Sequence, residues 1–346
     1  MIFFRKKYFA GLDIGTSSIK LVQLKEAKDT EFDYQVENIQ YSDREDPTLN
    51  QLKEVIDKMV KDTKKLGDNV VVGIQGISIF TRYLEIPKIS PKELEVALPI
   101  EAKKFIPFPM DEVRLTYTQV GTLSKDEKKM GITFVGIPRN QIQRVEKFFT
   151  EHKINVKDFE TPAFALTRGF KTTRHYRRGE TVLIINIGTK YTNLVICRDG
   201  GVYFARDIQI GGRDFTKALI GSDAPEYAKA ELKKRTTDLF SKAEFYLNIH
   251  SVVEDWFKEI SDSTDYFYNY LLDMPQEIDR VILTGGGSMM NGLPYFLSKK
   301  LDRPVLVDSN FPGKSETTDK ERDISKVAPS LKFAYGLALR AQEESI

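Results

Sequence analysis

Alternating apolar and polar positions predict a run of β-strands at the start of the chain. Apolar residues fill most of positions 8–14, and a second alternating run begins at Ile19 after a short polar stretch. This spacing predicts a strand, a tight turn and a second strand, within a run of three strands over residues 8–42. Helical spacing over residues 47–66 and a buried-type strand at residues 69–73 complete a β-β-β-α-β opening.

A middle segment, residues 78–157, has a different character. It begins with an alternating strand, and Ser90, Pro91 and Glu93 then form the signature of a capped helix start. The remaining pattern predicts strands and an amphipathic helix at residues 113–120, 132–137 and 140–152. We expect an α+β package inserted into the first half of the chain.

The second half resumes the order of the first. A helix begins near Pro162, and a strand, a turn and two further strands follow, the last over residues 201–210. The later pattern predicts helices at residues 226–235, 239–273, 293–301 and 330–340 and a strand at residues 280–284. Phe333 and Leu337 of the closing helix are expected to be buried against the first half.

The polar turn after the first strand has the composition of a phosphate-binding loop. Gly15 lacks a Cβ, so backbone N–H groups can approach an anion closely. Three hydroxyl side chains follow it, those of Thr16, Ser17 and Ser18. Asp13 is placed to hold Mg²⁺ directly or through water, and Lys20 to return to the same phosphates. Taken alone, the turn is equally compatible with an ordinary hairpin that carries an exposed lysine.

The same turn recurs in the second half and favours the phosphate-binding alternative. The stretch around Asn186 aligns without gaps with the stretch around Asp13, keeping Ile-Gly-Thr and then Leu-Val. A repeat at about half the chain length predicts two similar domains that face each other. The second turn supplies Gly188, Thr189 and Lys190. Two phosphate turns that face one cleft form a clamp.

Two further glycine stretches suit a nucleotide. Gly211 and Gly212 open a predicted helix, whose free N–H groups would offer an approach point for an anion or a ribose. After the strand at residues 280–284 come Gly285, Gly286, Gly287 and Ser288. Three glycines between a strand and a helix let a flat ligand lie on the backbone, and this interpretation is favoured over glycine as loop filler.

Composition excludes several other classes of protein. The chain has 346 residues, a hydrophobic content of 41% and a net charge of +2, and no stretch is apolar enough to span a membrane. Because Cys197 is the single cysteine, the chain can form neither an intramolecular disulfide nor a multi-cysteine metal site. The basic runs at residues 171–178 and 233–235 lack the interleaved aromatic residues of a nucleic-acid platform. We expect a soluble protein of a reducing compartment, with no secretory signal and no nucleic-acid partner.

Together, the stretches GLDIGTSSIK, INIGTKYTNL, IGGRDFTKAL and VILTGGGS resemble the actin-like ATPase superfamily. The resemblance implies an α/β fold in which two ribonuclease-H-like domains clamp ATP and Mg²⁺ between two phosphate turns and a glycine-rich adenosine turn. It also implies that Glu231 and Lys234 lie where the superfamily contacts the ribose and base. We expect the first domain to comprise residues 1–168 and 330–346, and the second residues 169–329.

Within this superfamily the chain is most similar to the PilM family of type IV pilus assembly proteins. The likeness covers almost the whole chain and is carried by YFAGLDIGTSSIKLVQL, RYLEIPKISPKELEVALPIEAKKFIPFPMDEV, GIPRNQIQRV, TGGGSMMNGLPYFL and APSLKFAYGLALR. It implies a cytoplasmic protein held at the inner membrane by partners, namely the cytoplasmic N-terminal peptide of a PilN-like protein and other pilus assembly proteins. In this family, which is similar to FtsA, that peptide docks near the groove between the inserted subdomain and the core.

The sequence departs from the superfamily where hydrolysis would need support. The candidate catalytic positions are Asp13, Glu160 and Asn186. Asn186 and Asn193 stand where the superfamily has aspartate, and an amide does not supply the charge that helps hold Mg²⁺ or orient water. The superfamily usually has Glu directly before Pro, whereas a threonine separates Glu160 from Pro162. Nucleotide binding should survive these changes better than hydrolysis, so we expect at most a slow ATPase.

Three functions of this fold compete. A small-molecule kinase would need a general-base aspartate, and the sequence offers none beyond Asp13. An FtsA-like filament protein would end in an amphipathic tether, which we do not expect after the closing helix. The favoured hypothesis is a scaffold in which ATP and Mg²⁺ set the angle between the domains and so bias a partner groove on the insertion. We expect an extended peptide to add to the strand edge at residues 80–86, with the helix at residues 92–105 as the wall.

Overall fold

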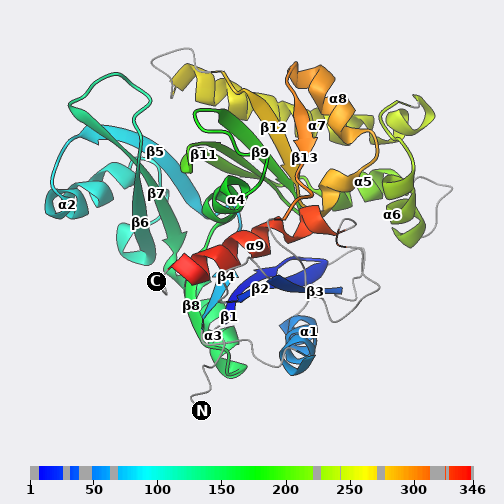
Figure 1. Cartoon of the computed structure of the whole chain (residues 1–346), viewed down its shortest axis with the longest axis horizontal. Helices are drawn as coiled ribbons and strands as arrows, with labels where there is room; N and C mark the ends of the chain where they lie inside the picture. Colours follow the sequence, from blue (N-terminus) through cyan, green and yellow to red (C-terminus); the bar gives the residue numbers. More distant parts are fainter. Residues whose placement is uncertain are drawn as a thin grey trace.

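The computed structural model describes residues 8–25, 32–38, 49–62, 69–220, 227–241, 243–270, 277–311, 324 and 327–343. The strands within these ranges form three sheets (Figure 1). Two sheets have the corresponding orders β3-β2-β1-β4-β8 and β11-β10-β9-β12-β13, and the third has the order β5-β7-β6. The matching connectivity of the two larger sheets confirms the repeat predicted from the paired turns.

The first sheet contains the first phosphate turn. Its elements are β1 (Tyr8–Ile14), β2 (Ser18–Lys25), β3 (Phe32–Asn38), α1 (Leu49–Asp62), β4 (Val70–Gly73) and β8 (Val156–Glu160). β1, β2 and β3 pair antiparallel, whereas β4 runs parallel to β1 and β8 parallel to β4. Leu12, Ile19 and Val72 pack with Ile56 of α1 in one buried cluster, so burial fixes both strands that flank the turn.

The second sheet contains the second turn. Its elements are β9 (Thr181–Ile187), β10 (Thr192–Arg198), β11 (Gly201–Ile208), α5 (Gly212–Ala218), α6 (Tyr227–Thr236), α7 (Ala243–Tyr270), β12 (Arg280–Thr284), η2 (Gly286–Met289), α8 (Leu293–Leu301) and β13 (Val305–Val307). Trp256 of α7 is fully buried, lies edge-on to Phe215 with ring centroids 5.7 Å apart, and donates its Nε1–H to the Thr192 hydroxyl at 3.0 Å. These contacts hold α5 and α7 against the strand that follows the turn.

The inserted segment forms the three-stranded sheet and two helices. Its elements are β5 (Phe80–Pro87), α2 (Pro91–Ala102), η1 (Met110–Glu112), β6 (Val113–Val120), β7 (Lys129–Pro138) and α3 (Arg139–Glu151). The predicted capping box is present, because the Ser90 hydroxyl accepts the N–H of Glu93 and the Glu93 carboxylate accepts the N–H of Ser90. α2 packs against Ile132 and Phe134 of β7, so it covers one face of this sheet.

Two helices, α4 (Pro162–Lys171) and α9 (Ala328–Glu343), cross between the two larger sheets (Figure 1). A Cβ on Gly336 would fall 1.9 Å from the Ala165 carbonyl oxygen, and one on Gly11 would fall 2.0 Å from that of Ala334. These glycines therefore allow the backbone of α9 to contact α4 and β1 directly.

The closing helix also connects the two halves. Phe333 and Leu337 are 3% and 0% exposed and pack against the first sheet, as predicted. At its other side, the Pro329 carbonyl accepts the Thr284 hydroxyl at 2.8 Å and the Gly285 N–H at 2.8 Å. The closing helix therefore contacts both larger sheets directly.

Several predicted element limits differ from the structure by a few residues. The strand predicted over residues 201–210 ends at Ile208. The helix predicted over residues 239–273 begins at Ala243, because the Asp238 carboxylate accepts the N–H groups of Phe240 and Ser241 and forms a turn there. The predicted end of that helix lies outside the described residues. The domain boundaries at residues 168 and 330 stay a prediction.

Candidate nucleotide cleft and partner groove

The first turn places an acid and a lysine side by side. Asp13 lies directly opposite Lys20 in the antiparallel register of β1 and β2. The Lys20 ammonium is 2.9 Å from an Asp13 carboxylate oxygen, and both side chains are largely buried. Gly15 closes the turn by donating its N–H to the Ser18 carbonyl at 3.1 Å. The hairpin register thus brings the predicted metal and phosphate side chains together.

The second turn has the same geometry and contacts the first. Gly188 donates its N–H to the Tyr191 carbonyl at 2.9 Å, as Gly15 does in the first turn. The hydroxyl oxygens of Ser17 and Thr189 are 2.6 Å apart and share a hydrogen bond. The two turns therefore meet tip to tip.

A cavity of about 50 Å³ remains between the turns, and we call it the nucleotide cleft after the ligand predicted from the sequence. Its lining residues are Asp13, Gly15, Thr16, Lys20, Gln75, Asn186, Gly188, Thr189, Lys190, Tyr191, Gly285, Gly286, Ser330 and Phe333. Among these described residues Asp13 carries the only carboxylate. Small-molecule sites usually measure about 300–1,000 Å³. The space directly between the turns is therefore smaller than a typical ligand site.

The glycine turn after β12 lies directly on β9. A Cβ at Gly285 would fall 2.5 Å from the Ile187 carbonyl oxygen, and one at Gly287 would fall 2.3 Å from the Ile187 side chain. No atom lies within 4 Å of a Cβ built on Gly286, which lines the cleft. Ser288 is buried and donates its hydroxyl to the Gly285 carbonyl at 2.7 Å. Gly285 and Gly286 therefore line the cleft, whereas Gly287 and Ser288 shape the turn.

The N-terminus of α5 supports the second turn. Gly212 donates its N–H to the Gly188 carbonyl at 2.8 Å, and the next residue of the helix donates to the Thr189 carbonyl at 2.9 Å. The N–H of Gly211 is bound by the Asp214 carboxylate at 2.8 Å. The prediction that these N–H groups are free was therefore wrong, because the helix end packs on the turn.

Glu231 and Lys234 of α6 form an ion pair that fastens α6 to α5. The Lys234 ammonium lies 2.6 Å from the Glu231 carboxylate and donates to the Gly212 carbonyl at 2.8 Å and the Thr216 hydroxyl at 2.7 Å. Burial lowers the pKa of Lys234, and the Glu231 carboxylate opposes that shift. With three acceptors, the ammonium has no donor left over. Neither side chain lines the cleft, and their contact with a ribose or base stays a prediction.

The two asparagines of the second turn extend hydrogen bonds away from the cleft. Asn186 donates to the Asn193 side-chain oxygen at 2.6 Å, and Asn193 donates to an Asp207 carboxylate oxygen at 2.7 Å. The other Asp207 oxygen accepts the N–H of Gly76 at 3.1 Å. Burial raises the pKa of Asp207, while the hydrogen bonds from Asn193 and Gly76 oppose the shift. These bonds join the cleft to the loop that precedes β5.

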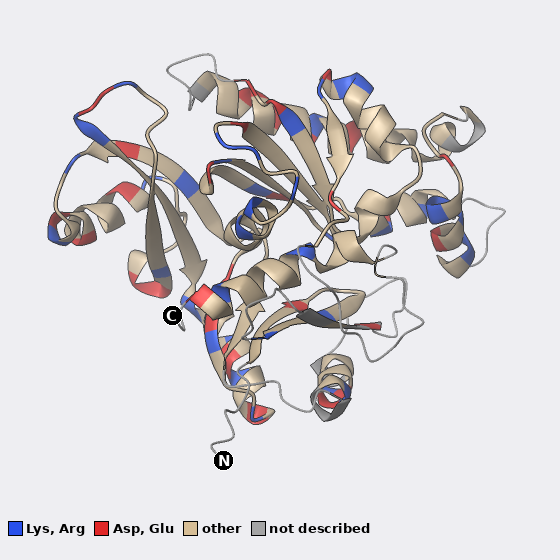
Figure 2. Ribbon diagram, in the orientation of Figure 1, with Lys and Arg blue, Asp and Glu red and all other residues tan. Residues whose placement is uncertain are grey.

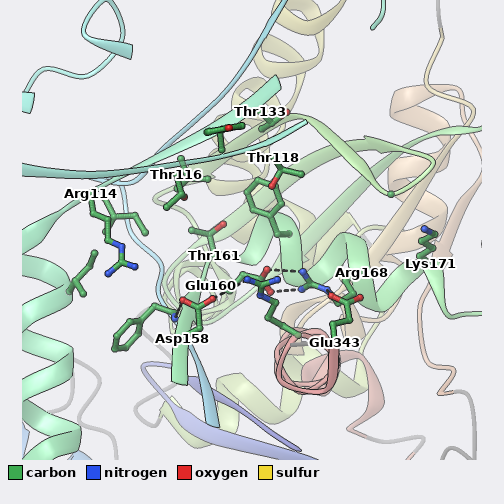
Figure 3. A pocket seen from close by; sticks show the side chains of 18 of the residues that line it. Arg114, Thr116, Thr118, Thr133, Asp158, Glu160, Thr161, Arg168, Lys171 and Glu343 are labelled. Atoms are coloured by element: carbon green, nitrogen blue, oxygen red, sulfur yellow. Dashed lines mark hydrogen bonds and ion pairs between the residues drawn. The ribbon is translucent and has the colours of Figure 1, made fainter. Parts of the chain in front are cut away.

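A second cavity of about 440 Å³, which we call the lateral groove, lies between the inserted sheet and the helices α4 and α9 (Figure 3). Its lining residues are Arg114, Thr116, Tyr117, Thr118, Thr133, Val135, Ile137, Ile142, Asp158, Phe159, Glu160, Thr161, Phe164, Arg168, Lys171, Asp199, Gly200, Arg340 and Glu343. It includes one predicted site residue, Glu160.

One wall of the lateral groove is a face of β6 and β7. The cross-strand pairs on this face are Arg114 with Ile137, Thr116 with Val135, and Thr118 with Thr133. Because side chains alternate along a strand, α2 covers the opposite face, so the helix predicted as a wall at residues 92–105 does not line this groove, and docking against it stays a prediction. The predicted peptide-binding edge on β5 instead lies beside β11, where the rings of Tyr83 and Tyr203 are 5.1 Å apart.

The floor of the lateral groove is an ion-pair network. Both Glu160 carboxylate oxygens accept hydrogen bonds from the Arg168 guanidinium, at 2.5 and 2.9 Å. Arg168 also pairs with Glu343 at 2.9 Å, and Arg340 lies 3.3 Å from Asp158. Burial raises the pKa of Glu160, although Arg168 opposes the shift. Glu160 thus lies in the lateral groove and is bound to Arg168.

Comparison with known proteins identifies the family. The family described as type IV pilus assembly protein PilM matches residues 11–342. The chain belongs to the PilM family. Among the described residues, no helix of this PilM-family chain has the length and apolar character needed to cross a membrane.

Solved structures share the fold of this PilM-family chain. The structure titled as the PilM–PilN type IV pilus biogenesis complex is 22% identical, with a TM-score of 0.78, and the match covers 96% of this chain and 98% of that one. MreB 5 of Spiroplasma citri bound to AMPPNP is 10% identical (TM-score 0.58; 98% and 97% covered). The ethanolamine utilization protein EutJ from Carboxydothermus hydrogenoformans is 14% identical (TM-score 0.53; 96% and 89% covered). This actin-like fold agrees with the predicted fold class.

Sequence reasoning missed several cleft residues of this PilM-family chain. Tyr191 follows Lys190 in the aligned second turn, so the repeat could have suggested it. Gln75 lies just beyond the carboxyl end of the parallel strand β4, a recognisable position for ligand contacts. Ser330 lines the cleft only because α9 passes between the sheets, and no local sequence pattern predicts this position of α9.

Proposed function

We propose that this chain is an ATP-binding scaffold of type IV pilus assembly that docks the cytoplasmic N-terminal peptide of a PilN-like inner-membrane protein. The family match and the neighbour solved as a PilM–PilN complex support the partner, and the neighbour solved with AMPPNP supports the nucleotide. The observation that carries the proposal is that one helix lines both cavities, with Phe333 of α9 in the nucleotide cleft and Arg340 in the lateral groove.

In this proposal the phosphates of ATP lie between the two turns. Asp13 holds Mg²⁺ through water, and the Lys20 ammonium contacts phosphate oxygens. The remaining proposed phosphate contacts come from Gly15, Thr16, Ser17, Ser18, Gly188, Thr189 and Lys190. Bound Mg²⁺ would neutralise phosphate charge. The residues fit Mg²⁺ and the phosphates, because the Asp13 carboxylate and the Lys20 ammonium are adjacent. They also fit the adenosine, because Gly286 has no side chain to cover the backbone on which it would lie.

Hydrolysis is slow at most in this proposal. Asn186, at a position where the superfamily has an acid, engages its amide with Asn193. Glu160 binds Arg168 in the lateral groove, where it is separate from the cleft lining. Without a second carboxylate at the phosphates, the described cleft residues offer little to activate a water.

The lateral groove is the proposed peptide site. β6 pairs only with β7 among the described strands, so its outer edge can accept an extended peptide. The wall offers hydroxyl groups beside apolar side chains, and β8 and the C-terminal end of α9 carry both acidic and basic residues (Figure 2). Such a surface suits a peptide of mixed polarity. Docking there would hold the chain at the inner membrane through its partner.

The docking proposal is tested with a peptide that carries the cytoplasmic N-terminal residues of the PilN-like protein from the same genome. Thr118→Trp fills the groove, whereas Gln119→Trp adds the same bulk to the next residue of β6, which does not line it. In fluorescence anisotropy, Thr118→Trp should weaken binding at least about tenfold, which is about 1.4 kcal/mol, and Gln119→Trp should not. Equal affinity of both variants, or no binding by the wild type, would reject this site.

Point substitutions are preferable to removal of residues 78–157. Tyr83 and Leu123 of the insertion belong to the buried cluster of the second sheet, and Thr133 donates its hydroxyl to the Val202 carbonyl. Deletion would therefore expose apolar surface and leave a backbone acceptor unpaired.

A further inference from the structure

A further small cavity borders the lateral groove, with which it shares the lining residue Thr161. Its volume is about 20 Å³, enough for one water molecule. Its polar lining includes Asn193 and Asp207 from the second sheet and Thr161 at the start of α4. Thr161 also lines the lateral groove. We call this space the bridging cavity.

Thr161 has an unpaired hydroxyl in this position. The residue is 5% exposed, and its Oγ1 has no hydrogen-bond partner in the described structure. It is the N-cap residue of α4, but its side chain makes no capping hydrogen bond. A buried hydroxyl without a partner is unfavourable by about 1–3 kcal/mol. A water molecule in the bridging cavity would satisfy it.

The hydrogen bonds on the other side of the bridging cavity have a fixed direction. Both oxygens of the Asp207 carboxylate accept, one from Gly76 and one from Asn193. Because an amide has its donor and acceptor on opposite atoms, Asn193 must present its oxygen to Asn186, which must donate. Asn186 lines the nucleotide cleft. A group that binds Asn186 there would therefore disturb the whole series.

We propose that Asn186, Asn193, Asp207 and Thr161, joined by one water in the bridging cavity, form a polar relay through which nucleotide in the cleft changes the peptide affinity of the lateral groove. The inference rests on the proposed function and adds its regulation. Occupancy of the cleft reorients Asn186, the change passes through Asn193 to Asp207, and the water transmits it to Thr161 at the groove. Helix α9 offers a separate mechanical route, so the test must distinguish the two.

The test measures peptide affinity with and without a non-hydrolysable MgATP analogue, using the full chain and the labelled PilN-like peptide described above. Thr161→Val removes the unpaired hydroxyl with little change of shape. Thr167→Val is the matched control on the same helix, since its hydroxyl already donates to the Ala163 carbonyl at 2.7 Å. Asp207→Asn breaks the relay at a residue that lines neither the cleft nor the lateral groove.

The expected result is that nucleotide changes the wild-type peptide affinity by at least about fivefold. This ratio should fall to near one in Thr161→Val and Asp207→Asn and persist in Thr167→Val, while both relay variants still bind the nucleotide. If the wild type binds both ligands independently, or if both relay variants keep the full ratio, the relay is overturned and the proposed function stands. If the wild type binds neither ligand, the proposed function itself fails.

Discussion

Ser17 and Thr189 share a hydrogen bond of 2.6 Å between the tips of the two turns. The hydroxyls belong to corresponding parts of a repeated hairpin, one from each half of the chain. This contact leaves a cavity of about 50 Å³, too small for a nucleotide. In the proposed function the phosphates enter between the two turns, which breaks this bond, and Ser17 and Thr189 then contact the phosphates.

The strength of the hydrogen bond between Ser17 and Thr189 can be measured with a double-mutant cycle. Ser17→Ala and Thr189→Val each remove one hydroxyl, and their coupling in the free energy of unfolding should be about 0.5–1.5 kcal/mol in the free protein. With MgATP bound the coupling should disappear, because each hydroxyl then contacts phosphate. Chemical denaturation of the four proteins measures both values. A coupling unaffected by MgATP would mean that the turns stay joined.

Leu337 of α9 is predicted to be important for stability. It is fully buried against the first sheet, so Leu337→Ala should lower the free energy of unfolding by about 2–5 kcal/mol. Leu339→Ala, at a partly buried position of the same helix, should have a smaller effect. Denaturant midpoints compare the two, and equal midpoints would contradict the packing of α9.

Glu85 in the insertion is expected to make a pH-dependent contribution to the free energy of unfolding. Its carboxylate accepts hydrogen bonds from the Tyr83 hydroxyl at 2.6 Å and from the N–H groups of Leu123 and Ser124 at 2.7 and 2.8 Å. Burial raises the pKa of Glu85, but hydrogen bonds from Ser124, Tyr83 and Leu123 outweigh it and hold the pKa below its usual value. The stabilisation is therefore present above the ordinary pKa and is lost as pH falls through the lower, folded-state value.

Glu85→Gln should reveal this contribution. At pH 7 the variant should be less stable than the wild type by on the order of 1 kcal/mol, and the difference should shrink below the ordinary glutamate pKa of 4.5. Glu95→Gln, at an exposed position of α2, serves as the control. Thermal unfolding from pH 7 to pH 3 provides the test. A difference that stays constant over this range would exclude the carboxylate as its origin.

Local sequence patterns were sufficient to predict the structure where residues close in sequence determine it. Alternation predicted β1 and β2, and a tight turn between antiparallel strands necessarily brings Asp13 opposite Lys20. Ser90 and Glu93 predicted the start of α2 because a capping box spans only four consecutive residues. The repeat predicted the second turn, and its strand pairing has the same form.

Local patterns failed where distant segments meet. β7 carries apolar residues on both faces, so its sequence does not tell that Phe134 faces α2 while Val135 faces the lateral groove. Asp207 looks like one acid in an alternating strand, and its role depends on Gly76, which lies in a distant part of the sequence. The N–H groups of α5 were expected to be free because nothing local indicates that the helix packs on the second turn.

The central claim is that the two turns clamp MgATP. Calorimetric titration of the wild type and Asp13→Ala tests it most directly. Asp126→Ala, in the exposed hairpin of the insertion, is the control. ATP should bind the wild type and Asp126→Ala more tightly with Mg²⁺ than with a chelator. Asp13→Ala should lose this magnesium dependence and bind MgATP at least about tenfold more weakly. A wild type that gives no binding heat, or an Asp13→Ala variant that binds MgATP as tightly as the wild type, would contradict the clamp.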